Sequence, residues 1–145
     1  MPNWCSNQLT VTGATDDVAE VVTAVRGRDD DGNECPLDFR RILPPPLEAT
    51  DNVSWRYDHW GTKWLPVHPH VDKNDKGEFI VIFDSAWSPP EKFIVALSEH
   101  FPDVTVELRY DLPDDGYGAS LAYKAGALVR EDHWEDQEED EAAQV

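Results

Sequence analysis

Two tryptophans flank a glycine, a threonine and a lysine in the segment Trp60-Gly61-Thr62-Lys63-Trp64. Two indoles and one ammonium group can form an aromatic wall with a single cationic donor, which suits a small ligand or a peptide. Large aromatic side chains are more often core formers, so a packed cover over a sheet is the simpler interpretation. Under either interpretation we expect Trp4 and Trp87 to join this cluster. The candidate binding residues are Asn3, Trp4, Trp60, Gly61, Thr62, Lys63, Trp64 and Trp87.

Other residues that could do chemistry have weaker patterns. His68 and His70 would share one face of an extended segment, with His59 upstream, but no third ligand has a suitable spacing, so we assign no metal site. Cys5 and Cys35 are too few for an iron-sulfur centre. The sequence lacks the G-x-G-x-x-G, P-loop, G-x-S-x-G and H-E-x-x-H motifs, so we assign no cofactor and no catalytic residue. A non-catalytic protein is the expectation.

The charge is strongly acidic: 30 Asp and Glu against 12 Lys and Arg give a formal net charge of -18. Eight of these acids lie in residues 131–145, and the rest of the chain still carries a charge of -10. Such a surface repels phosphate backbones and anionic lipids, which disfavours nucleic-acid and membrane partners and favours a basic protein. One local group of arginines could still let the chain bind single-stranded nucleic acid: Arg26, Arg28, Arg40, Arg41 and Arg56.

The elements that must position these residues follow from hydrophobic periodicity. A helix is predicted after Thr15, which would cap it, and a second helix after Ser88 and Glu91, which have the spacing of a capping box. Alternating or apolar runs predict strands at 7–12, 64–71 (at a sheet edge, because it contains prolines), 79–83 and 104–110, and a hairpin at 119–123 and 127–130.

This order predicts an α+β fold of the ferredoxin-like type, a βαββαβ sandwich with both helices on one sheet face and an extra C-terminal hairpin. Residues 79–83 are continuously apolar and would need cover on both faces. We therefore expect an insertion at about 28–63 to place Trp60 and Trp64 over the other face. Residues 1–130 would form this single domain, and residues 131–145 an acidic, disordered tail.

Five separated motifs together resemble a known family: Pro2-Asn3-Trp4-Cys5-Ser6-Asn7, Leu37-Asp38-Phe39 with Ile42 and Pro44, Trp60-Gly61-Thr62-Lys63-Trp64, Ala86-Trp87-Ser88-Pro89-Pro90 and Tyr117-Gly118. Over about residues 1–124 the chain is similar to the YubB-type ferredoxin-like domain family of uncharacterised plasmid and bacteriophage proteins. The resemblance implies a ferredoxin-like fold without iron-sulfur chemistry and an origin in a mobile element, and it transfers no catalytic residue.

Three functions remain open at this stage. The first is a binding module whose acidic surface meets a basic host or phage protein; in its more specific form, the module imitates DNA and occupies a host defence or regulatory protein. The second is a small-molecule-binding protein or enzyme that uses a pocket between Trp60 and Trp64. The third is a single-stranded nucleic-acid binder. The sequence shows no signal peptide and no membrane-spanning run, so we expect a cytoplasmic protein, in the host cell if it is phage-encoded.

Overall fold

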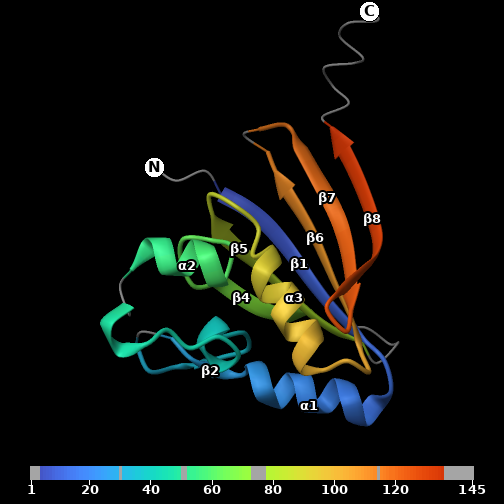
Figure 1. Cartoon of the computed structure of the whole chain (residues 1–145), viewed down its shortest axis with the longest axis horizontal. Coiled ribbons are helices and arrows are strands. Elements are labelled where there is room, and N and C mark those ends of the chain that lie inside the picture. Colours follow the sequence, from blue (N-terminus) through green and yellow to red (C-terminus); the bar gives the residue numbers. More distant parts are fainter. Residues whose placement is uncertain (1–3, 30, 50–51, 73–77, 114, 136–145) are drawn as a thin grey trace, which may run out of the picture.

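The structure is a computed structural model that describes residues 4–29, 31–49, 52–72, 78–113 and 115–135. It contains a six-stranded antiparallel sheet in the order β4-β5-β1-β6-β7-β8 (Figure 1). The strands are β1 (Trp4–Thr12), β4 (Val67–Asp72), β5 (Phe79–Ala86), β6 (Thr105–Leu112), β7 (Tyr117–Lys124) and β8 (Ala127–Glu135). None of the helices in the described ranges is long and apolar enough to span a membrane.

The succession β1, α1 (Thr15–Val25), β4, β5, α3 (Glu91–His100) and β6 is the predicted βαββαβ unit. β4 lies at the edge of the sheet, as predicted from the prolines at 66 and 69. The helices contact one sheet face through apolar stripes, which include Val21 of α1 and Phe93 of α3, both fully buried. An α+β fold of the ferredoxin-like type is therefore confirmed in its core strands and helices.

Both predicted side-chain caps are wrong. Thr15 is the first residue of α1, and Ala14 is the N-cap residue without a side-chain hydrogen bond. α3 begins at Glu91, and the hydroxyl of Ser88 donates instead to the carbonyl of Gly61 at 2.6 Å. The insertion helps to cap α3, because the amide of Phe93 donates to the carbonyl of Trp60 at 3.2 Å.

The insertion contains short elements that its irregular sequence did not predict. β2 (Gly27–Arg28) pairs with β3 (Glu34–Cys35), and two 3-10 turns follow, η1 (Phe39–Arg41) and η2 (Leu47–Ala49). The helix α2 (Val53–His59) begins after Asn52, whose side chain accepts from the amide of Trp55. Figure 1 shows α2 and β2 on the same side of the sheet as α1 and α3.

The predicted position of Trp60 over the opposite sheet face is therefore wrong. Trp60 packs with Phe39 at 5.6 Å between ring centroids, and Phe39 packs with Phe93 of α3 at 4.5 Å. The insertion thus extends the core on the helix-bearing face. The opposite face needs less cover than predicted, because polar side chains such as Gln8 and Arg109 alternate with the inward residues of β1 and β6. Ile80 lies on that face and is still buried.

β7 and β8 extend the sheet beyond β6. β8 continues to Glu135, so the first five residues of the expected tail belong to a strand, while residues 136–145 lie outside the described residues. Trp134 holds this end of β8 to the sheet: its indole Nε1 donates to Asp111 at 2.8 Å, and the Arg109 guanidinium lies 4.9 Å from the ring centroid.

Candidate binding surface

Four side chains form an aromatic patch where β1 begins and β5 ends: Trp4, Lys63, Trp64 and Trp87. The rings of Trp4 and Trp64 lie 6.0 Å apart at 52°. The Nζ atom of Lys63 lies 5.0 Å from the Trp64 ring centroid and 5.6 Å from that of Trp87. An ammonium group over two rings is a cation-π arrangement, which limits the rotamers of all three side chains. Trp87 is the most exposed of the four, at 45%.

One buried and one half-buried hydrogen bond fix the backbone beneath this patch. The Thr62 hydroxyl donates to the carbonyl of Ala86 at 2.8 Å, and the Ser88 hydroxyl donates to the carbonyl of Gly61. These two bonds join the 60–64 loop to the residues on both sides of Trp87. We call these bonds the loop clamp.

Asn7 and Ser85 attach the loop clamp to the sheet. Asn7 Nδ2 donates to Ser85 Oγ at 2.9 Å, and Ser85 Oγ donates to the carbonyl of Ser88 at 2.8 Å. Asn7 is 3% exposed and Ser85 is fully buried, so these bonds form where water does not compete. The backbone on which the aromatic patch stands is therefore rigidly connected to β1 and β5.

Trp87 has an unfavourable backbone conformation, with φ of 75°. A bulky side chain in the left-handed region costs about 1–2 kcal/mol relative to the usual conformations. Such strain persists only where the surroundings enforce it, and it concentrates at functional sites. The loop clamp supplies this enforcement, and the result is an indole that projects into solvent.

Gly61 allows the 60–64 loop to approach α3. Its φ is 85°, and a Cβ atom there would lie 3.1 Å from the amide nitrogen of Lys92 and 3.2 Å from that of Glu91. Glu91 is the first residue of α3 and lies beside this loop, and burial raises the pKa of its carboxyl group above the ordinary value.

The structure separates the predicted site residues into two groups. Trp4, Lys63, Trp64 and Trp87 come together at the surface. Trp60 and Thr62 are buried, at 1% and 0% exposed, and the Trp60 indole donates to the carbonyl of Leu43 at 3.0 Å. Trp60 therefore packs in the core and does not face Trp64 across a pocket. Asn3 lies outside the described residues.

The histidines considered for a metal site have ordinary contacts. His59 stacks on Trp55 with ring centroids 4.2 Å apart, and His70 faces the carbonyl of His68. Within the described ranges, the structure places no group of three His, Cys, Asp or Glu side chains where they could hold a metal ion.

Four of the five arginines grouped in the sequence line one open hollow of about 420 Å³: Arg26, Arg28, Arg40 and Arg41. Arg56 is elsewhere, 5.6 Å from the centroid of the Trp60 ring. The sequence identified the group, but it gave no indication that a short β2–β3 hairpin and a 3-10 turn gather these four side chains around a cavity.

A family model described as the ferredoxin-like domain in Api92-like protein matches residues 67–145. The chain belongs to the Api92-like family. A crystal structure of the protein api92 from Yersinia pseudotuberculosis is similar in fold, with a TM-score of 0.68 and 11% sequence identity. The similarity covers 92% of this chain and 98% of that chain. No curated protein matches the chain.

These comparisons support the ferredoxin-like fold that the sequence resemblance implied. The Api92-like match includes β4 to β8 and Trp87, whereas the other members of the aromatic patch and the four clustered arginines precede it.

Proposed function

We propose that this protein is a non-catalytic binding module of bacteriophage or plasmid origin, related to YubB-type domains, and that its aromatic patch docks on a basic host or phage protein. The observation that carries the proposal is Trp87, an exposed indole in a strained conformation that the loop clamp enforces. Aromatic side chains of this kind dominate the binding energy of protein interfaces, because they bury much apolar surface at little entropic cost.

The net negative charge of the chain supports the proposal of a basic protein as the partner. A formal charge of -18 accelerates the encounter with a positive protein, and it also keeps nucleic acids and other acidic proteins away. Lys63 is the cation at the centre of the patch, and it would fix the docking register by pairing with one acceptor on the partner. In a sharper form of the proposal, acidic side chains imitate DNA phosphates, and the partner is a DNA-binding protein of host defence or regulation.

Site-specific photo-cross-linking tests this proposal. A photoreactive phenylalanine analogue replaces Trp87 in one variant and Val129 in a matched control, since Val129 is also exposed, at 58%, but lies on β8. The expected result is a covalent adduct with a basic protein from position 87 only, which decreases as the salt concentration rises. Equal adducts from both positions, or an adduct from position 87 with an acidic protein, would contradict the proposal.

A further inference from the structure

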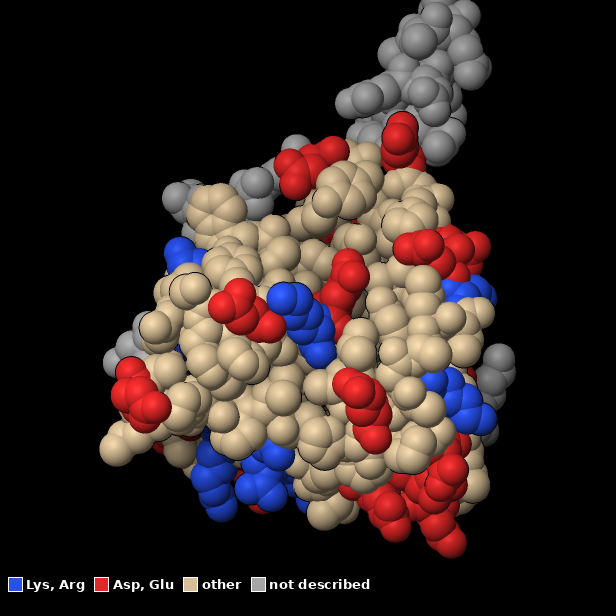
Figure 2. Space-filling view, in the orientation of Figure 1, with Lys and Arg blue, Asp and Glu red and all other residues tan. Residues whose placement is uncertain are grey.

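The arginine hollow is an unusual feature on a chain of this charge. The sequence contains seven arginines, and four of them line this single cavity of about 420 Å³. Figure 2 shows basic side chains side by side at the lower left of the molecule, where Figure 1 places β2. Like charges repel when they are gathered in this way, and the two carboxylates that also line the hollow, Asp38 and Glu34, offset only part of this repulsion.

Specific backbone contacts hold together the segments that form the hollow. The amide of Asp38 donates to the carbonyl of Val25 at 2.8 Å, which brings η1 against the end of α1. Gly27 makes this approach possible, because a Cβ atom at position 27 would lie 2.6 Å from the Cβ of Asp38. Asp38 also accepts from the amide of Arg40, and so caps η1.

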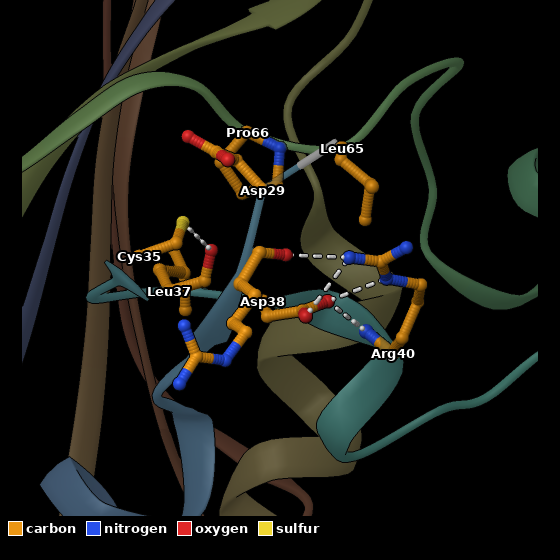
Figure 3. Close-up of a pocket in the computed structure, with 8 residues that line it drawn as sticks. Asp29, Cys35, Leu37, Asp38, Arg40, Leu65 and Pro66 are labelled. Carbon is orange, nitrogen blue, oxygen red and sulfur yellow. Dashed lines mark hydrogen bonds and ion pairs between the residues drawn. The ribbon is translucent and has the colours of Figure 1, made fainter. Parts of the chain in front are cut away.

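Arg40 is the fixed member of the group. Its Nε atom lies 2.9 Å from Asp38 Oδ1, and one terminal nitrogen donates to Asp38 Oδ2 at 3.1 Å and to the carbonyl of Arg28 at 2.7 Å. Figure 3 shows the Asp38 carboxylate and the Arg40 guanidinium facing each other between β2 and η1. Asp38 is 6% exposed and the Arg40 side chain is 38% exposed, so the pair is partly buried, and Arg40 also holds the backbone of Arg28 in place.

The charges around the hollow do not balance. Arg40 neutralises Asp38, and Glu34 is the cross-strand neighbour of Arg28. Arg26 and Arg41 remain, both exposed, and the described part of the chain offers neither of them an ion pair. Two guanidinium groups can bind one phosphate group through paired, charge-assisted hydrogen bonds.

We propose that this hollow binds a small organic phosphate, such as a nucleoside monophosphate. A volume of about 420 Å³ lies within the range of small-molecule sites. A smaller cavity of about 90 Å³ shares Arg28, Asp38 and Arg40 with it and adds Asp29 and the largely apolar group of Cys35, Leu37, Leu65 and Pro66 (Figure 3). Arginines beside an apolar slot favour an anion with an organic part over inorganic phosphate.

The surroundings select a compact anion. Asp29, Asp31 and Glu34 are exposed on the β2–β3 hairpin beside the arginines. Glu34 lines the hollow itself and Asp29 lines the adjoining cavity, so these acids oppose any anion, and they oppose an extended polyanion most because it carries more negative charges. This site is separate from the aromatic patch, and its existence does not depend on the proposed protein partner.

Calorimetric titration at low ionic strength tests the proposal, with AMP, inorganic phosphate and a single-stranded oligonucleotide without terminal phosphates as probes. The variant Arg26→Gln/Arg41→Gln removes two exposed positive charges from the hollow. The matched control Lys92→Gln/Lys124→Gln removes two exposed positive charges elsewhere, on α3 and β7. Thermal unfolding followed by circular dichroism verifies that both variants remain folded.

We expect AMP to bind more tightly than inorganic phosphate, and the arginine variant to weaken AMP binding about 100-fold, because it loses two charged hydrogen bonds and each costs roughly tenfold. The control variant should change the affinity for AMP by less than about twofold, because screening makes the effect of distant charges on this affinity small. In two-dimensional NMR spectra, AMP should shift the amide signals of Gly27 and Arg28. The absence of AMP binding to the wild type, an equal loss in both variants, or tighter binding of the oligonucleotide than of AMP would overturn the proposal.

Discussion

Two substitutions at one position isolate the strain beneath the aromatic patch. Trp87→Gly and Trp87→Ala both remove the indole, so both lose the same packing against Lys63, and they differ chiefly in the presence of a Cβ atom. At a φ of 75° that atom costs about 1–2 kcal/mol, whereas glycine loses roughly 0.5–1 kcal/mol more conformational entropy on folding. We therefore expect the glycine variant to be more stable than the alanine variant by about 1 kcal/mol, which reverses the usual order.

Urea denaturation measures this difference directly, and thermal unfolding gives an independent value. For a chain of 145 residues, about 1 kcal/mol corresponds to roughly 3 °C in the midpoint of thermal unfolding. If the alanine variant were as stable as the glycine variant, or more stable, the backbone at position 87 would not be held in the left-handed region. The loop clamp would then not hold Trp87 in a strained conformation.

Three further predictions concern the arginine hollow and the buried titratable groups. Gly27→Ala should destabilise the fold by about 2 kcal/mol, because the added methyl group displaces Asp38; urea denaturation measures this, and an unchanged midpoint would refute the predicted collision. Burial raises the pKa of the Cys5 thiol to about 12 and also raises the pKa of Cys35. Both thiols should therefore react slowly with a disulfide reagent at pH 7, with the half-exposed Cys35 first, and a native protein in which Cys5 reacts first would contradict the assigned burial. Burial raises the pKa of Glu91 above its ordinary value of 4.5, so the folded state binds the proton more tightly than the unfolded state, and this group's contribution to stability falls as the pH rises through that window. Glu91→Gln should consequently stabilise the protein at pH 7 and lose this advantage below about pH 4.5, and a less stable variant at pH 7 would show that the carboxylate makes a favourable contact instead.

The regular part of the fold follows from local patterns in the sequence. Val21 and Val25 lie on the apolar stripe of a helix, and apolar and polar residues alternate around Leu9 as in a half-buried strand. In each element, a few neighbouring residues are enough to predict which side is buried. The prolines at 66 and 69 restrict their segment to an edge, where β4 lies. These signals are local, and the structure agrees with them.

The remaining features depend on contacts between distant segments. The Ser88 hydroxyl could cap α3 or bond to the 60–64 loop, and only the position of Gly61 decides between the two. Trp60 and Trp64 have the same residue type and are four residues apart, yet one fills the core and the other lies in a surface patch. Residue type gives hydrophobicity but no direction, so the sequence predicted the members of the patch but not the burial of Trp60 on the helix-bearing face.

The affinity of the cross-linked partner, once purified, for three versions of this protein tests most directly whether the aromatic patch is the docking surface. They are the wild type, Trp87→Ala and Tyr117→Ala, and Tyr117 is a matched control because it is 43% exposed but lies on β7. We predict that Trp87→Ala weakens binding about 30-fold or more, as expected for an interface residue worth about 2 kcal/mol, while Tyr117→Ala leaves the dissociation constant unchanged. Equal affinities for the wild type and Trp87→Ala would contradict the claim that the aromatic patch is the docking surface.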